Sequence, residues 1–295
     1  MSCHSWRDMT AAPTSVSIFG PGLMGGSLLM ALRRRSPKTK LGVWARRGAV
    51  VDQIKQRKLA DFGGTDAAAV AADSQMIVLC LPVDHLAEAA MAIKSTLPRG
   101  AWVTDVGSVK QPVVDALENV FGCGGSFVGS HPMCGSEEAG LDAARADLYE
   151  GALCVVTPTA HSDPQAVAAV CQLWQMAGAR TVEMTPAEHD HAAAVVSHVP
   201  HVAAALLVEL VGAENPAFRK MCAGGFRDTT RIASGSPDLW AGILSSNRTE
   251  VLAALRKLGS ASARIESALA DNDIGTLRSF LENAARQRSQ ILSPS

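Results

Sequence analysis

The stretch Val16–Gly26, VSIFGPGLMGG, decides the fold of this chain. Residues Val16–Phe19 favour a buried strand, and they run directly into a G-x-G-x-x-G motif formed by Gly20, Gly22 and Gly25. In such a motif the first glycine permits a tight turn, the second lets a pyrophosphate approach the backbone, and the third lets the following helix pack close to the strand. We therefore predict a dinucleotide-binding unit, although a glycine-rich turn in an ordinary α/β domain has the same local pattern.

The helix that follows this turn begins with Leu23 and Met24, and apolar residues then recur at helical spacing. The N–H groups of a first helical turn have no partner inside the helix and carry a partial positive charge. They therefore suit the phosphates of a dinucleotide. We predict that Leu23 and Met24 belong to the cofactor-binding segment together with the glycines.

The end of the next predicted strand, Leu41–Trp44, selects between the two nicotinamide cofactors. An acidic residue there would bind the 2′-hydroxyl of the adenosine ribose of NAD. Here Arg46 and Arg47 follow the strand, and no carboxylate occurs before Asp52. Because two guanidinium groups suit a 2′-phosphate, the sequence favours NADP and leaves NAD possible. The alternative interpretation is that both arginines only cap a solvated loop.

Strand-like runs alternate with helical segments through the first part of the chain. Met76–Leu81 and Ala101–Asp105 are continuous apolar runs, which are typical of parallel strands buried on both faces. Leu153–Thr157 is a further predicted strand, and Arg180–Met184 is the last one. This alternation predicts βαβ units and an α/β fold with a Rossmann-type, doubly wound parallel sheet.

A capping box, Thr185–Glu188, ends this part and opens a long helix that reaches about Val211. We expect its apolar run to be a buried core helix and not a membrane span, because histidines, a proline and a glutamate interrupt it. No strand pattern follows. The predicted domains are therefore a dinucleotide-binding domain over residues 1–185 and an all-helical domain over residues 186–295.

Composition excludes several classes of protein. With 47% hydrophobic residues, the 295-residue chain can bury large cores, and its net charge of −1 gives no reason to expect a nucleic-acid partner. Residues 1–14 lack the apolar core of a signal peptide. The seven cysteines are scattered without a C-x-x-C pair, which indicates reduced thiols and no structural zinc site. We expect a cytoplasmic protein with no membrane partner.

His131 is the first candidate for chemistry. It comes just after a short predicted strand, Phe127–Gly129, and therefore close to the carboxyl-end crevice of the sheet, where ligands bind in this architecture. An imidazole with an ordinary pKa near ~6.5 can take a proton at neutral pH. Ser108 follows the preceding strand and could hydrogen-bond one ring nitrogen, which would set the tautomer. A His-Pro pair alone is more often structural.

The other histidines have weaker signals. His189 and His191 lie in the first turn of the long helix, and their spacing indicates no metal site. His198 and His201 are three residues apart and share a helical face, but no third ligand is evident. We therefore predict no metal site. We expect His198 and His201 to contact substrate or to form core hydrogen bonds. Cys134 is expected to be a small packed residue and not a nucleophile.

Several segments together identify a family. Beyond the glycine motif these are, in chain order, DVGSVK (105–110), GSHPMCGSEEAG (129–140), SHVPH (197–201) and FRDTTRIA (226–233). In this order the chain resembles the prephenate/arogenate dehydrogenase family of tyrosine biosynthesis, from about residue 16 to past Trp240. The resemblance implies oxidative decarboxylation of prephenate to 4-hydroxyphenylpyruvate, or of arogenate to tyrosine, with hydride transfer to NAD(P). It also implies a homodimer formed through the helical domain.

The resemblance further implies roles for individual residues. His131 would hydrogen-bond the ring hydroxyl of the substrate and act as general base, and Ser108 would orient the substrate near the nicotinamide. Arg231 would hold a substrate carboxylate, and His201 would contact the substrate from the long helix. Three more positions would edge the pocket or support its loop: Ser136, Glu137 and Asp228.

Two other functions compete with this one. A β-hydroxyacid dehydrogenase would carry a catalytic lysine on the long helix, and Ala187–Val211 contains none. A non-catalytic NADP-sensing protein would give His131, His201 and Arg231 no joint purpose. The sequence does not distinguish prephenate from arogenate, because both substrates have the same ring and both carboxylates.

Overall fold

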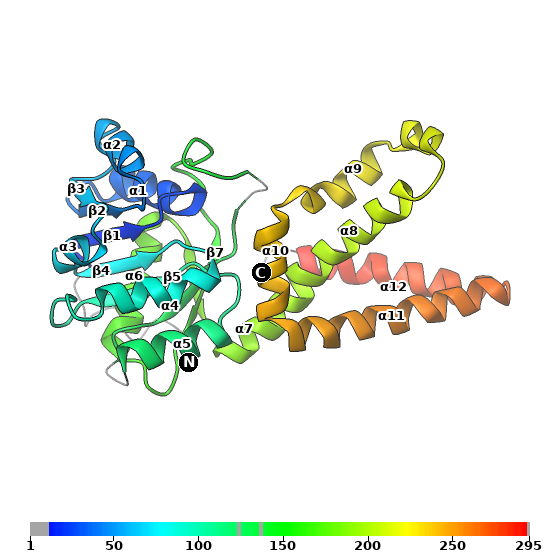
Figure 1. Cartoon of the computed structure of the whole chain (residues 1–295). Coiled ribbons are helices and arrows are strands. Elements are labelled where there is room, and N and C mark those ends of the chain that lie inside the picture. The colour runs from blue at the N-terminus through cyan, green and yellow to red at the C-terminus, as the bar shows by residue number, and fades with distance from the viewer. Residues whose placement is uncertain (1–11, 123–124, 136–137, 294–295) are drawn as a thin grey trace. The chain divides into compact units, whose positions relative to one another are not determined.

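The computed structural model describes residues 12–122, 125–135 and 138–293 (Figure 1). The N-terminal segment for which no signal peptide is predicted lies mostly outside these residues. The chain forms two compact units, Met1–Asn247 and Arg248–Ser295. The predicted boundary at residue 185 marks the change from strands and helices to helices alone. It does not coincide with the division between these two units, and it stays a prediction.

The first unit is built on a five-stranded parallel sheet with the order β3-β2-β1-β4-β5. This order confirms the Rossmann-type fold, and the switch in connection direction at β1 and β4 creates the crevice in which ligands bind. The sequence did not predict β3, which is short and contains two glycines. The strands are β1 (Ser15–Phe19), β2 (Lys40–Trp44), β3 (Phe62–Gly64), β4 (Met76–Leu79) and β5 (Trp102–Asp105).

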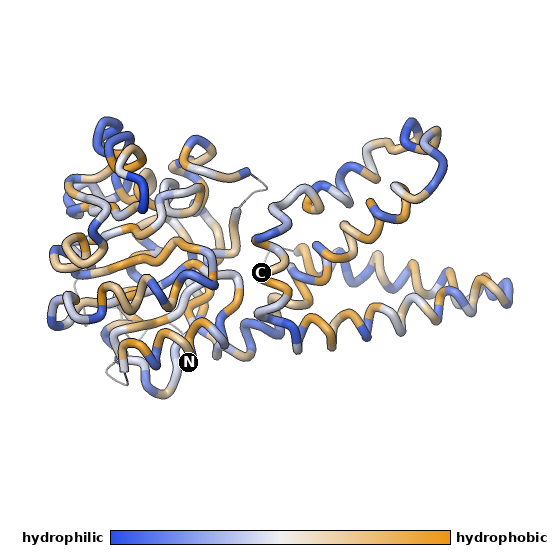
Figure 2. The backbone as a smooth tube through the Cα atoms, in the orientation of Figure 1, coloured by the Kyte–Doolittle hydropathy of each residue, from blue (hydrophilic) through white to orange (hydrophobic). Residues whose placement is uncertain are grey.

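Helices cover both faces of this sheet, because alternate strand residues are apolar on opposite sides. Ile18 and Val78 belong to one core, and Phe19 and Leu79 belong to the other. Figure 2 shows the hydrophobic colour concentrated along the central strands. The helices of this part are α1 (Leu23–Arg35), α2 (Gly48–Gln56), α3 (Ala67–Ala72), α4 (Val83–Ile93), α5 (Gln111–Phe121) and α6 (Pro164–Ala177).

A second, three-stranded sheet differs from the prediction. Its order is β6 (Gly129–Pro132), β7 (Leu153–Thr157), β8 (Arg180–Glu183), and β6 runs antiparallel to β7. The expectation of parallel strands throughout is therefore wrong here. His131 lies within β6 and not just after a strand, because Phe127 forms only an isolated bridge with Val103 before the chain pairs with β7.

The capping box is confirmed. The Thr185 hydroxyl accepts a hydrogen bond from the Glu188 N–H, and the Glu188 carboxylate accepts one from the Thr185 N–H. The helix it opens consists of α7 (Pro186–Ala193), a π-helical turn η1 (Ala194–His198) and α8 (Val199–Gly212). Pro200 explains the wider turn, because it has no N–H to donate to the carbonyl of Val196 and its ring crowds that carbonyl.

The expectation that this helix is buried in a core is wrong for the chain as described. Only one side of it is covered, and α8 is coloured largely hydrophobic in Figure 2. By length and composition, Pro186–Gly212 would also pass as a membrane span, which is weak evidence for a single helix. The large apolar side chains that it leaves exposed are Val195, Val196, Leu206, Leu207, Val208 and Leu210.

The remaining described residues are helical, with no further strand among them. The first unit continues through η2 (Pro216–Met221), α9 (Gly224–Thr230), η3 (Arg231–Ser234) and α10 (Pro237–Ser246). The second unit consists of α11 (Arg248–Ala270) and α12 (Ile274–Leu292).

Candidate active site

The three glycines of the first motif have three different surroundings. Gly20 has φ +93°, and a Cβ there would lie 2.4 Å from the Cys80 carbonyl oxygen. A Cβ on Gly25 would lie 2.4 Å from the Gly20 carbonyl oxygen. At Gly22, by contrast, the other described residues place no atom within 4 Å of the Cβ position, apart from the adjoining backbone. Gly20 and Gly25 therefore serve the fold, whereas Gly22 keeps open a space that a pyrophosphate fits.

The N-terminus of α1 faces this space, and neither its N-cap nor its first turn supplies a side chain that would bind its N–H groups. Gly22 is the N-cap and has no side chain, and the first turn contains no acidic residue. The N–H groups of Leu23 and Met24 therefore remain available to an anion. At the end of β2, Arg46 and Arg47 are both exposed, and neither forms an ion pair within the described residues. These surroundings fit a phosphorylated dinucleotide.

A buried ion pair joins the end of β5 to β6. Lys110 is fully buried, and its ammonium group donates to the Asp105 carboxylate and to the Ser130 carbonyl oxygen at 2.9 Å. The Asp105 carboxylate also accepts the N–H groups of Gly107 at 2.8 Å and of Ser130 at 3.1 Å. This network fixes the backbone next to His131, so that the imidazole starts from a rigid position.

A chain of side chains runs from His131 into the interior. Nδ1 of His131 lies 2.8 Å from Nε2 of His189, and the two rings meet edge to face. Nδ1 of His189 lies 2.8 Å from Oδ1 of Asp190. The Asp190 carboxylate accepts the backbone N–H of Lys110 at 2.7 Å and that of Gln111 at 2.9 Å, at the start of α5. The site therefore contains a His-His-Asp arrangement whose carboxylate is held by a helix N-terminus.

Burial lowers the pKa of three histidines of this site, His131, His198 and His201. The loss of hydration, helped by the nearby His189, Lys110 and His198, holds the pKa of His131 well below its usual 6.5. Burial likewise lowers the pKa of His198 to about 4, although Asp190 opposes the shift. The pKa of His201 is lowered by burial as well. At neutral pH the His131 ring is therefore unprotonated on one nitrogen and can take a proton.

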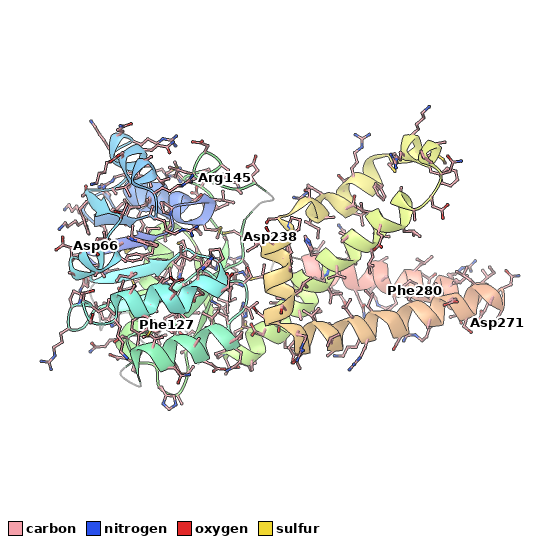
Figure 3. The ribbon with its side chains drawn as sticks, viewed as in Figure 1. Asp66, Phe127, Arg145, Asp238, Asp271 and Phe280 are labelled. Atoms are coloured by element: carbon pink, nitrogen blue, oxygen red, sulfur yellow. The ribbon has the colours of Figure 1, made fainter. Side chains whose placement is uncertain are left out.

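Asn247 contacts His198, and Trp240 contacts His201. Asn247 Nδ2 donates to the backbone oxygen of Asp190 at 2.8 Å and lies 3.1 Å from Nδ1 of His198. Trp240 lies in α10, whose first turn contains Asp238 (Figure 3), and its ring stacks on that of His201 with centroids 3.5 Å apart. Nδ1 of His201 is buried without a hydrogen-bond partner among the described residues. Such an atom needs a ligand or water as its partner.

The remaining predicted residues have different positions. Ser108 is half-buried and makes no hydrogen bond with His131 in the described part of the chain, since Nδ1 of that ring faces His189. The predicted hydrogen bond from Ser108 to one ring nitrogen of His131 is therefore not present among the described residues. Arg231 is exposed at the start of η3, which packs against α8. Ser136 and Glu137 lie outside the described residues. Asp228 is exposed in α9.

Burial raises the pKa of the Cys134 thiol to about 12, which agrees with a packed and unreactive residue. No three histidine, cysteine, aspartate or glutamate side chains gather to hold a metal anywhere in the described ranges.

Sequence reasoning missed His189, Asp190, Trp240 and Asn247. A usable signal for the first two is a histidine directly followed by an aspartate, in the first turns of a helix that a capping box fixes after the last strand. Trp240 and Asn247 give no such signal, because only the tertiary fold brings α10 and the residue after it to the histidines.

Comparison with known proteins covers nearly the whole chain. The family model "Prephenate dehydrogenase, nucleotide-binding domain" matches residues 29–183, and "Prephenate dehydrogenase, dimerization domain" matches residues 185–283. Prephenate dehydrogenase of Bacillus subtilis is 36% identical over 249 residues, which are 83% of this chain and 67% of that protein. Cyclohexadienyl dehydrogenase of Zymomonas mobilis is 30% identical over 92% of this chain and 94% of that protein.

A solved structure extends the similarity to three dimensions. The crystal structure of prephenate dehydrogenase from A. aeolicus in complex with hydroxyphenyl propionate and NAD+ has a TM-score of 0.88 and 31% identity. It covers 96% of this chain and 99% of that one.

Proposed function

Since this chain belongs to the prephenate dehydrogenase family, we propose how its own residues perform the reaction of that family. The chain is an oxidoreductase of tyrosine biosynthesis that uses a nicotinamide cofactor. Its reaction is the oxidative decarboxylation of prephenate to 4-hydroxyphenylpyruvate, or of arogenate to tyrosine. The choice between the two substrates, the cofactor preference and the residue roles below are our proposals.

His131 acts as the general base. Its Nε2 makes no hydrogen bond within the described residues, and its Nδ1 is engaged by His189. Nε2 takes the proton of the ring hydroxyl, so that an O–H bond breaks and an N–H bond forms. When bound, the nicotinamide supplies the acceptor for the hydride that leaves ring carbon C4. The bond from C1 to its carboxylate then breaks and carbon dioxide leaves. The electron pair of that bond makes the ring aromatic, and the ring oxygen regains the proton from Nε2 of His131.

The observation that carries this proposal is the buried imidazole of His131, whose Nδ1 is engaged by His189 and whose Nε2 has no partner among the described residues. A positioned general base contributes typically ~10²- to 10⁴-fold to a rate. Aromatisation drives the reaction forward, so the protein has to supply mainly positioning and this base.

The substrate is held by residues from the helical part. His201 is the contact from α8, and its unpartnered Nδ1 supports that role. Arg231 holds a substrate carboxylate through charge-assisted hydrogen bonds, Ser108 orients the ring near the nicotinamide, and Ser136 and Glu137 edge the pocket.

The preferred cofactor is NADP. Arg46 and Arg47 are exposed and without ion pairs in the described ranges, at the position where a carboxylate would bind the NAD ribose. Arg46→Asp should lower kcat/KM for NADP and narrow or reverse the preference, whereas Arg99→Asp, also an exposed arginine, should change neither value. A wild-type kcat/KM clearly higher with NAD would contradict this proposal.

The functional protein is a cytoplasmic homodimer formed through its helical domain. Exposed apolar side chains on α8 support such an interface. The described cysteines form no disulfide, which agrees with a reducing compartment.

The assignment is tested by steady-state kinetics with prephenate and arogenate, each with NADP and with NAD. We expect reduction of the cofactor together with carbon dioxide release for at least one pair. Absence of turnover with all four pairs, by folded protein, would overturn the proposed function.

A further inference from the structure

We infer that His189 and Asp190 are positioning residues for the reaction, which hold a proton on Nδ1 of His131 and leave Nε2 free to accept the proton of the substrate. The inference rests on the proposed role of His131 as general base. It assigns a purpose to two buried polar residues that contact neither the glycine turn nor the arginines of the cofactor site.

The direction of each hydrogen bond follows from Asp190. Both of its carboxylate oxygens accept backbone N–H groups, which can only donate. The carboxylate is therefore the acceptor of the bond with Nδ1 of His189 as well. A neutral His189 then carries its one proton on Nδ1 and has a lone pair on Nε2. Since Nε2 of His189 is the acceptor, Nδ1 of His131 must donate.

This sequence of bonds fixes the tautomer that the chemistry needs. With its proton on Nδ1, neutral His131 has its lone pair on Nε2, which is the nitrogen without a partner among the described residues. The opposite arrangement arises if His189 is protonated on both nitrogens. His131 would then accept at Nδ1 and carry its proton on Nε2, where it could not act as a base.

His189 and Asp190 are buried, and several hydrogen bonds hold them in place. His189 is 2% exposed and Asp190 is 4% exposed. The capping box fixes the start of their helix, the first N–H groups of α5 fix the Asp190 carboxylate, and Asn247 Nδ2 holds the Asp190 carbonyl oxygen. These contacts fix His189 and Asp190, and His189 in turn restricts rotation of the His131 ring.

The His189–Asp190 pair also supplies negative charge near His131. After His131 accepts a proton, its ring is a buried cation. Of the charged and titratable groups that face it, Lys110 is already paired with Asp105, and His198 is neutral because burial lowers its pKa to about 4. Asp190 is then the anion that can stabilise the new charge, through the dipole of His189. No electron moves through His189 or Asp190. The proton that Nε2 takes from the substrate hydroxyl returns to the ring oxygen when carbon dioxide leaves.

The first test reads the tautomer directly and needs no turnover. Two-dimensional ¹H–¹⁵N spectra of the histidine side chains at pH 7.5 should show His131 protonated on Nδ1 and unprotonated on Nε2, assigned by loss of the signals in His131→Asn. In His189→Phe this preference should be lost. Wild-type His131 protonated on Nε2 would overturn the inference.

The second test compares two substitutions of the same residue. His189→Phe removes the acceptor, and we expect kcat to fall about 10- to 100-fold, a part of what a general base contributes. The acid limb of the kcat/KM profile should also move, because His189 contacts Nδ1 of His131 and its removal changes the pKa of that ring. His189→Gln retains a carbonyl acceptor for the Nδ1 proton and should recover part of the loss.

His191→Gln is the matched control, since this exposed histidine lies on the same helix, and it should leave kcat and the acid limb unchanged. A structural role alone would lower the melting temperature of His189→Phe and leave the acid limb in place, and that result would overturn the inference. Failure of the proposed function can be told apart from failure of this inference. In the first case the wild type is inactive, and its His131 tautomer can still be measured.

Discussion

Three histidines of the site have a pKa below the ordinary value, which leaves the binding of an anionic substrate to other residues. Burial lowers the pKa of His131, His198 and His201, and the charge of Lys110 is matched by Asp105. None of these groups therefore offers a free positive charge to a substrate that is a dianion as prephenate. The Arg231 side chain, at the start of η3, is the group to which we assign that task.

Arg231→Ala should raise KM for prephenate at least about tenfold with a smaller fall in kcat, because the carboxylate is charged in both the ground state and the transition state. Arg231→Lys should recover only part of the loss, since lysine lacks the planar fork. Arg227→Ala, in the preceding turn, is the matched control and should leave KM unchanged. If Arg231 only braces its loop through Asp228, the melting temperature of Arg231→Ala falls while KM stays at the wild-type value.

Sequence reasoning reached those residues whose type matches the chemistry and whose neighbours form a family motif. His131, His201 and Arg231 are of this kind. It gave His189 no function, since the role of that residue depends on a ring nitrogen 58 positions away and on a carboxylate capped by another helix. The predicted partnership of Ser108 with the His131 ring shows the same limit, because proximity to a strand end in the sequence does not decide which side chain reaches a ring nitrogen.

Among the elements, the glycine turn could be predicted in detail. The stretch from β1 to α1 is local, and each glycine has a reason that acts over a few residues. The second sheet could not be predicted as well, because the antiparallel pairing of β6 with β7 depends on contacts made across about twenty residues of intervening chain. The π-helical turn before Pro200 is visible only in the structure, although the proline is its physical cause.

Two alanine substitutions in the glycine turn should separate folding from cofactor binding. Gly22→Ala places a methyl group where the other described residues have no atom within 4 Å, apart from the adjoining backbone. The melting temperature should therefore stay near wild type while the Kd of the cofactor rises about tenfold or more. Gly25→Ala pushes against the Gly20 carbonyl oxygen and the Ile18 side chain, which should cost about 1–3 kcal/mol of the free energy of unfolding. Wild-type cofactor affinity in Gly22→Ala would contradict the assigned pyrophosphate position.

For the whole molecule, the neutral histidines predict how stability depends on pH. The pKa of His131, His198 and His201 is lowered in the folded state, whereas each has an ordinary value near ~6.5 when unfolded. Below that value the unfolded chain binds more protons than the folded one, so the free energy of unfolding falls as pH decreases.

The melting temperature should therefore decrease between about pH 6.5 and pH 4, the folded-state value for His198. The carboxyl groups with a lowered pKa, Asp61, Glu188 and Asp273, lose their contribution in a more acidic range. His198→Gln should flatten the slope, and the half-exposed His85→Gln should not. A melting temperature that stays constant down to pH 4.5 would exclude the assigned protonation states.

The exposed face of α8 predicts the assembly. Light scattering on the eluting protein at micromolar concentration should give twice the 30.8 kDa of the chain. Leu210→Lys should shift the mass toward the monomer, because Leu210 is 62% exposed on α8. Met91→Lys, 61% exposed on α4, should leave the dimer intact. A wild-type monomer under these conditions would rule out the proposed interface.

The central claim is that His131 takes the proton of the substrate. The most direct measurement is kcat of His131→Asn at saturating substrate and cofactor. The Kd of NADPH is measured by fluorescence on the same preparation. The account predicts that kcat falls about 100-fold or more while that Kd stays within about twofold of wild type, because the base is separate from the glycine turn. A kcat close to the wild-type value, in a variant that binds NADPH normally, would contradict it.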